Sequence, residues 1–277
     1  KDGSDKEEDK AKYDALTDEE KAMLADVTST ATMSLQDSHG DILSAIRKAY
    51  ENRVALTDVK AASGFGFGLS TTACMGPGSD DTDTPVYSFN EVYATTLFDS
   101  EGKIAAIYVY QLEVSTPNYD GASMPHFSGF PGQGGYNLDS DHDAKVDGKT
   151  EDTEENFAAE IASWQTKRER GADYVMGTGT WEEQMDKFEE TFVGMTVDEV
   201  EDWFEKYCSD LNGRPLKDGS DKEEDKAKYD ALTEEEKAML ADVTSTATMS
   251  LNDSHGDILA AIRDSLNNQV AIELTVE

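Results

Sequence analysis

The chain has 277 residues, 37% of them hydrophobic, and a formal net charge of −35. This length and composition allow a sizeable core and predict one to two domains. The charge excludes nucleic acid as a partner, because binding a phosphate backbone requires a concentration of Lys and Arg. Solubility is the simplest interpretation of so acidic a surface.

Two further features bear on the compartment. No segment approaches the roughly 18 consecutive apolar residues of a transmembrane helix, and Lys1 follows no signal peptide, as in a mature protein. Cys74 and Cys208, the two cysteines, are too far apart for a Cys-x-x-Cys motif. They either form one disulfide or stay free, which suits a cell-surface protein as well as a cytoplasmic one.

The first 25 residues are dense in Lys, Asp and Glu, and we predict a solvated linker or loose helix for their first part. Thr17 and Glu20 have capping-box spacing, which predicts a short helix that ends near Ala25, and the same spacing recurs at Thr233 and Glu236. Residues 26–34 are rich in Thr and Ser, whose side chains favour turns. They therefore predict a loop with exposed hydroxyls.

A second helix is predicted over about 41–53, because apolar residues recur there at helical spacing. Asp37 or Ser38 can cap it, so that its free N–H groups point back at the hydroxyls and could hold a phosphate. The simpler interpretation is that Ser38 and Asp41 only form an N-terminal cap.

Strand patterns follow. Residues 64–73 alternate Gly or Ser with apolar residues and predict a strand whose glycines let another backbone or a ligand approach closely. Residues 86–98 and 104–114, rich in Tyr and Val around a turn at 99–103, predict a β-hairpin.

Residues 117–136 interleave aromatic, Gly and Pro residues without periodicity, which predicts a shaped loop. The loop either covers a sheet or offers flat surfaces and hydrogen bonds to a ligand through His126, Phe127, Phe130, Gln133 and Tyr136. The acidic run that begins at Asp139 fails as an EF-hand, because Ala144 and Thr150 replace the required Gly and Glu.

Three helices are predicted next, over about 153–170, 181–193 and 196–208. The third opens with a capping box at Thr196 and Glu199. Its aromatic and Val side chains lie on one face, which favours a core role over a cofactor contact. Helices that follow a hairpin indicate an α+β fold.

The segment 1–56 recurs as 217–272, with 47 of 56 positions identical. So close a match indicates recent duplication of a module. It also repeats a short motif, Asp26-x-Thr28-Ser29-Thr30-Ala31-Thr32, as Asp242-x-Thr244-Ser245-Thr246-Ala247-Thr248.

This motif resembles the Asp-x-x-(Ser/Thr)-(Gly/Ser)-Ala-Thr motif of FMN-binding domains. In that family a dedicated FMN transferase joins FMN through its phosphate to the last Thr, so the resemblance implies that Thr32 and Thr248 are acceptors. The departures are Val27 and Val243, where Gly is common, and Thr30 and Thr246, where Gly or Ser is usual.

The order of hairpin, helices, motif and helix resembles PplA-type surface lipoproteins of Gram-positive bacteria, which carry tandem FMN modules. The resemblance implies an α+β fold of the FMN-binding domain type, with an antiparallel sheet packed against helices. Residues 58–277 would form a complete module. Residues 1–57 would be the motif-bearing C-terminal part of a preceding module.

The same resemblance implies extracellular electron transfer. The donor would be a membrane quinone-linked flavoprotein or quinol, and the acceptors would be ferric iron or free flavins. It also implies a cell-surface location, with an N-terminal lipid anchor outside this sequence. In this setting the acidic charge would disfavour an anionic reduced flavin and so lower its reduction potential.

Two alternatives stay open. The chain could be an acidic cell-surface binding module whose repeats are structural and hold no cofactor. It could also be a flavin-dependent terminal reductase with its own substrate pocket. No Ser/His/Asp arrangement or catalytic carboxylate pair is evident in the sequence, so a hydrolase is not expected.

Overall fold

The computed structural model describes residues 5–56, 59–79, 83, 85–118, 124–131, 137–138, 148–149 and 153–275. The chain divides into two compact units, Lys1–Thr57 and Asp58–Glu277. The first contains α1 (Glu7–Asp14), α2 (Asp18–Thr28), β1 (Gln36–Asp37), β2 (Gly40–Asp41) and α3 (Ile42–Glu51).

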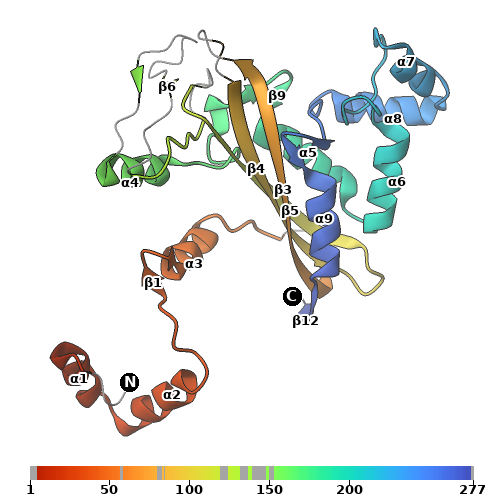
Figure 1. Ribbon diagram of the computed structural model, residues 1–277. Helices are drawn as coiled ribbons and strands as arrows, with labels where there is room; N and C mark the ends of the chain where they lie inside the picture. Colours follow the sequence, from red (N-terminus) through yellow and green to blue (C-terminus); the bar gives the residue numbers. More distant parts are fainter. Residues whose placement is uncertain are drawn as a thin grey trace. The chain divides into compact units, whose positions relative to one another are not determined.

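The second unit has an antiparallel sheet and several helices, which confirms the α+β prediction (Figure 1). Its strands are β3 (Ala61–Ser79), β4 (Pro85–Phe98), β5 (Ile104–Ser115), β6 (Asn137–Leu138), β7 (Gly148–Lys149), β8 (Val175–Met176), β9 (Gly179–Thr180), β10 (Asn252–Asp253), β11 (Gly256–Asp257) and β12 (Val270–Thr275). Its helices are α4 (Glu154–Ser163), the 3-10 turn Gly171–Asp173, α5 (Trp181–Phe192), α6 (Val197–Tyr207), α7 (Glu223–Asp230), α8 (Glu234–Thr244) and α9 (Ile258–Asn267).

The main sheet has the strand order β12-β3-β4-β5, with every neighbouring pair antiparallel. The predicted hairpin is confirmed as β4 and β5, in which Tyr93 lies opposite Tyr110. The predicted Gly-rich strand is confirmed as β3, which pairs with β4 along most of its length. The C-terminal strand β12 pairs with the other side of β3, so the end of the chain closes the sheet.

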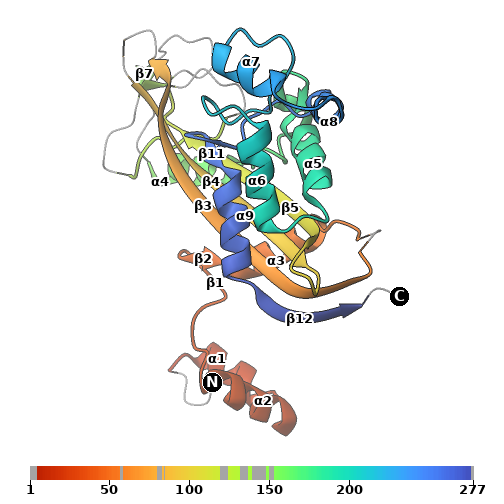
Figure 2. The same ribbon diagram turned by 90° about the vertical axis from the view of Figure 1, so that its right-hand side faces the viewer.

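Helix α9 lies along β3, as Figure 2 shows, and the glycines of that strand make this possible. A Cβ atom at Gly66 would collide with the carbonyl oxygen of Ser265, and one at Gly68 with that of Ala261. The close approach predicted for this strand is therefore to the backbone of a helix. Any larger residue would push α9 off the sheet.

The core lies between the sheet and helices α5, α6, α8 and α9. The rings of Phe188 and Phe192 stack with centroids 6.0 Å apart, and Trp203 packs edge-on against both. Trp203 belongs to α6, whose apolar face is buried as predicted. Capping boxes at Thr196 and Thr233 start α6 and α8, again as predicted.

The helix predicted over 153–170 ends at Ser163, so that prediction was too long. Residues after Trp164 run instead beside the edge strand β5, where the Lys167 N–H donates to the carbonyl of Gln111 at 2.8 Å. The Arg168 Nε donates to the carbonyl of Val109 at 2.6 Å, and the N–H of Val109 donates to Glu189 at 2.7 Å. These bonds occupy backbone donors and acceptors of the edge strand β5, which could otherwise pair with another strand.

The acidic segment at 7–14, for which a linker or loose helix was expected, forms the helix α1, and its counterpart at 223–230 forms α7. Both Cys74 and Cys208 are free, and Cys208 is buried. Within the described residues, no helix is long and apolar enough to cross a membrane. The acidic run after Asp139 lies largely outside the described residues.

Candidate functional site

The second copy of the motif begins inside a helix and ends beside a pocket. Helix α8 continues to Thr244, so the prediction that the helix ends before the motif was wrong. The Thr244 hydroxyl donates to the carbonyl of Leu240, four residues earlier, at 2.7 Å, a bond that lets Thr stay helical. Ser245 caps the helix, and Ala247 is fully buried. Thr246 and Thr248 thus lie in the short connection that follows.

Gln184 of α5 holds the backbone at Thr248. Its side-chain oxygen accepts from the N–H groups of Thr248 and Met249, each at 2.9 Å. Its amide nitrogen donates to the carbonyls of Met176 and Gly179 on the hairpin β8–β9. The Gln184 side chain is completely buried, so it fixes two chain segments at once.

The Thr248 hydroxyl faces the turn of the β8–β9 hairpin. Its oxygen lies 3.3 Å from the Thr178 hydroxyl and 3.4 Å from the oxygen of Gln184. Thr178 also donates to the carbonyl of Thr246. Asp242, at the start of the motif, forms an ion pair with Lys187 of α5 at 2.8 Å. Helix α5 therefore contacts both ends of the motif.

The helix after the motif is capped as the simpler interpretation predicted for Asp41, and not by the counterpart of Asp37 or Ser38. Residues 252–257 first form the small hairpin β10–β11, and Asp257, the counterpart of Asp41, caps α9 through the N–H of Ala260 at 2.8 Å. The N–H of Ile258 donates to the carbonyl of Leu251 at 2.9 Å. These N–H groups are satisfied within the chain and do not point at the Thr248 hydroxyl.

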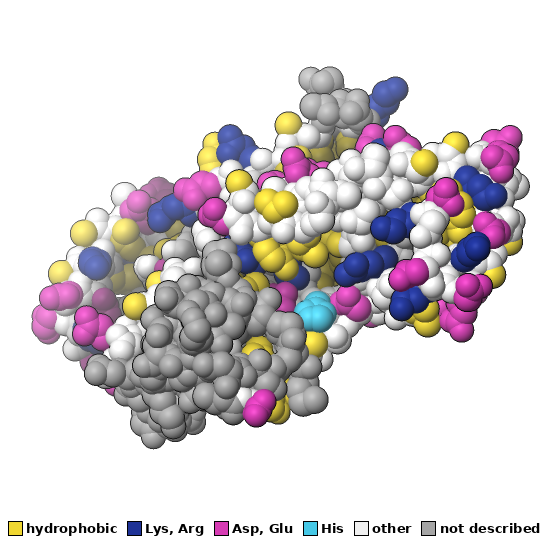
Figure 3. Space-filling view, turned by 90° about the horizontal axis from the view of Figure 1, so that it is seen from above, with side chains coloured by type: hydrophobic (Ala, Val, Ile, Leu, Met, Phe, Trp, Pro, Cys, Tyr) yellow, Lys and Arg dark blue, Asp and Glu magenta, His cyan; other side chains and the backbone are white. Residues whose placement is uncertain are grey.

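A pocket of about 240 Å³ opens directly after Thr248. Met249 and Ser250 form part of its wall, and the rings of Tyr174 and Trp181 form another part. The complete lining is Gln111, Glu113, Lys167, Tyr174, Met176, Trp181, Arg214, Met249, Ser250, Asp253, His255, Gly256 and Ile258. Figure 3 shows the face of the molecule seen from above. Hydrophobic side chains there lie between acidic and basic ones, and a His side chain lies next to the hydrophobic ones.

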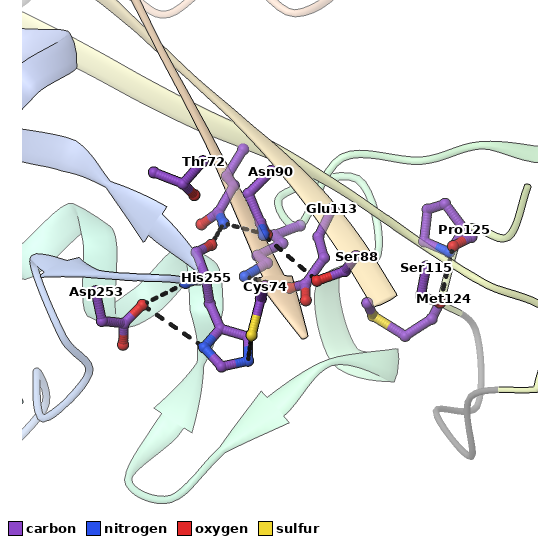
Figure 4. Close-up of polar contacts among 12 residues, drawn as sticks. Thr72, Cys74, Ser88, Asn90, Glu113, Ser115, Met124, Pro125, Asp253 and His255 are labelled. Carbon is purple, nitrogen blue, oxygen red and sulfur yellow. Dashed lines mark hydrogen bonds and ion pairs between the residues drawn. The ribbon is translucent and has the colours of Figure 1, made fainter. Parts of the chain in front are cut away.

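Charged side chains of both signs line this pocket. Lys167 and Glu113 form a buried ion pair at 2.9 Å, with 5% and 8% of their side chains exposed. Arg214 is exposed, and the structure records no ion pair for it among the described residues. The bond between His255 and Asp253 is the main cause that raises the pKa of His255, against an opposing effect of burial (Figure 4). Arg214 can therefore offer a cationic group to an anion, whereas Lys167 and His255 already lie against Glu113 and Asp253.

The predicted aromatic loop lies elsewhere. The Phe127 ring packs against Phe130, Phe157 and Trp164, with centroids 5.0 to 6.4 Å apart. The Trp164 indole N–H donates to the carbonyl of His126 at 2.8 Å. His126, Phe127 and Phe130 are not among the residues that line the pocket. Two other predicted residues, Gln133 and Tyr136, lie outside the described residues.

The first copy of the motif has the same local structure in an exposed setting. Helix α2 contains Asp26 and is capped by Ser29, whose hydroxyl donates to the carbonyl of Asp26 at 2.6 Å. Thr30 and Thr32 follow in an exposed connection. For Thr32 the structure records no side-chain partner among the residues described in this unit.

The residues that complete the second copy were not identified from the sequence. Tyr174, Thr178, Trp181 and Gln184 come from a segment about 70 residues before Thr248. Gln184 did carry a signal, because it occupies the apolar face of α5 together with Trp181, Met185 and Phe188. A polar residue at a core position of an amphipathic helix usually has a specific hydrogen-bonding role.

The donor set fits FMN. The Thr248 hydroxyl is an acceptor for a phosphoester, Arg214 could compensate a phosphate charge, and the partly exposed Tyr174 offers a flat surface. The pocket is smaller than the ~300–1,000 Å³ of typical small-molecule sites, so FMN would extend past its rim. No cluster suited to a metal ion occurs among the described residues.

The comparisons with known proteins give one partial match. No protein-family model matches the chain, and no solved structure is significantly similar to it. The chain is 48% identical over 108 residues to chlorophenol reductase of Desulfitobacterium hafniense, a match that covers 36% of this chain and 33% of that protein. The matched part thus spans about a third of this relative.

Proposed function

We propose that this protein is an extracellular electron-transfer flavoprotein that carries FMN as a phosphoester on Thr248, attached by an FMN transferase. The observation that carries the proposal is the position of the Thr248 hydroxyl, next to a pocket with aromatic walls and cationic side chains. When bound, FMN would supply one- and two-electron chemistry, and the protein would supply binding and orientation.

The chain's own residues have distinct roles in this proposal. Gln184 and Thr178 orient the segment that bears the acceptor hydroxyl. Arg214 compensates negative charge, and Tyr174 covers a planar ring. The acidic surface, with a net charge of −35, would disfavour an anionic reduced state and so lower the reduction potential.

The wider setting is part of the same proposal. A membrane quinone-linked donor would reduce the protein, and ferric iron or free flavins outside the cell would oxidise it. An N-terminal lipid would anchor it to the cell membrane. Residues 1–57 would be the motif-bearing C-terminal part of a preceding FMN-binding module, and residues 58–277 would be a complete second module.

The test is expression together with an FMN transferase. We expect a yellow protein that dithionite bleaches and a ferric chelate reoxidises. Substitution Arg214→Ala should shift the midpoint potential, measured by spectroelectrochemistry, without removing the covalent flavin. A colourless protein of unmodified mass would instead favour an acidic cell-surface binding module whose repeats are structural.

The name of the partial relative favours a second candidate, a flavin-dependent terminal reductase. That protein is named for reduction of a chlorophenol. Steady-state turnover that saturates with one organic substrate, at a fixed concentration of reductant, would support this candidate. Electron exchange of similar rate with chemically unrelated dyes would support the carrier.

A further inference from the structure

Cys74, His255 and Asp253 form a contiguous cluster, in which His255 and Asp253 also line the pocket and Cys74 has no role in the proposed function (Figure 4). The Cys74 sulfur on β3 lies 3.6 Å from His255 Nε2 and accepts from the Ser254 hydroxyl at 3.3 Å. On the other side of the ring, His255 Nδ1 lies 3.7 Å from Asp253 Oδ1. The imidazole is thus placed between a thiol and a carboxylate, an arrangement that activates thiols in other proteins.

The sheet fixes the turn that carries the imidazole. The carbonyl of Ser254 accepts from the Thr72 hydroxyl at 3.0 Å and from the Asn90 amide at 3.4 Å. The Gln111 amide donates to the carbonyl of His255. These bonds involve the backbone of the turn, so the ring stays free to interact with Cys74 and Asp253.

The charges around His255 favour its protonated form. Asp253 from the same hairpin is the principal cause that raises the pKa of His255, and Glu113 of β5 acts in the same direction. Burial and the ammonium group of Lys167 act against them. An imidazolium 3.6 Å from sulfur stabilises the thiolate over the thiol.

We propose that Cys74 is a nucleophilic thiolate and a site of reversible modification by low-molecular-weight disulfides. Cys74 transfers its proton to His255 and attacks one sulfur of the disulfide, whose S–S bond breaks as the new Cys74–S–S bond forms. The leaving thiolate takes the proton from His255. One protein thiol and one disulfide therefore give one mixed disulfide and one free thiol. A thiol reverses the step by the same chemistry.

Cys208 provides an internal control in the same molecule. Its side chain is only 1% exposed, and burial raises the pKa of its thiol. Cys74 is partly exposed. The chain has no other cysteine. A single thiol modification of the folded protein can therefore be assigned to Cys74.

The decisive experiment is the rate of Cys74 alkylation by iodoacetamide at pH 6.5, followed by intact mass. We expect Cys74 to react about sixfold faster than free cysteine, because its larger thiolate fraction outweighs the lower nucleophilicity of that thiolate. Substitution His255→Gln should remove this excess.

His39→Gln is the matched control, because His39 is the counterpart of His255 in the first copy and is 92% exposed; it should leave the rate unchanged. Bis(2-hydroxyethyl) disulfide should give one adduct that a thiol removes and that Cys74→Ser abolishes. A wild-type rate at pH 6.5 no higher than that of free cysteine, or a rate that His255→Gln does not lower, would overturn the proposal. The comparison of the wild type with free cysteine alone decides if the variant fails to fold.

Discussion

The two copies of the repeated segment share their local structure and differ in their surroundings. The capping residues Thr17 and Thr233 have φ/ψ of −67°/166° and −68°/166°, and each completes a capping box. Yet Ile46 of the first copy is 62% exposed, whereas its counterpart Ile262 is completely buried. Local sequence is therefore enough to set the helices and turns, while the sheet and α5 are needed to bury them and to complete the site.

Five of the nine sequence differences between the copies lie in α9, the helix that packs on the sheet. Asp264 of α9 accepts from the N–H of Leu69 at 3.0 Å, and the Ser265 hydroxyl donates to that of Thr96 at 3.0 Å. The corresponding residues of α3 are Lys48 and Ala49, which can make neither bond. The helix of the first copy therefore lacks the two side chains with which α9 bonds to this sheet.

The largest expected effect comes from truncating the matched isoleucines. Ile262→Ala should lower the free energy of unfolding of the second unit by about 2–5 kcal/mol, because it leaves a cavity in the core. Ile46→Ala should change it by less than about 0.5 kcal/mol. Urea denaturation of the full chain measures both. Equal effects of the two substitutions would refute the difference in burial.

A smaller effect is expected at the residue that orients Thr248. Gln184→Ala leaves the buried N–H groups of Thr248 and Met249 without their acceptor, which should cost about 1–3 kcal/mol. The amide of Thr248 should also lose protection against hydrogen exchange. Thr178→Val removes only the hydroxyl that contacts Thr246 and Thr248 and should have the weaker effect. Retained protection in Gln184→Ala would contradict the orienting role.

The smallest effect is a change in acid sensitivity. The bonds that Glu236 accepts from Lys206, Thr233 and Tyr207 lower its pKa to about 2. Because the unfolded value is higher, about 4.3, this carboxylate stabilises the folded protein above that pH and loses its contribution as the pH falls toward 2. Glu236→Gln should therefore flatten the decline of stability between pH 5 and 2.

Glu20→Gln is the control for this acid effect, because Glu20 occupies the same capping box in the first copy without a lysine partner. Stability measured by urea denaturation across this pH range should be the same as in the unmodified protein. An equal flattening by both substitutions would assign the effect to the capping box alone.

Elements with a strong local signal were predictable from sequence. The β4–β5 hairpin, the capping boxes at Thr196 and Thr233, and the approach of a backbone to the glycines of β3 all follow from local pattern. The pocket could not be predicted from the sequence, because tertiary packing alone brings Tyr174, Trp181 and Gln184 close to the segment at Thr248. The overlong helix at 153–170 failed for the same reason, since its C-terminal part bonds to an edge strand instead.

The central claim is that Thr248 has a complete site whereas Thr32 has only the local motif. Intact mass, measured after expression with an FMN transferase, tests it most directly in the unmodified chain and in the Thr32→Ala and Thr248→Ala variants. The account predicts an FMN addition that Thr248→Ala removes and Thr32→Ala leaves in place. An unmodified chain, or an addition that disappears only with Thr32→Ala, would contradict it.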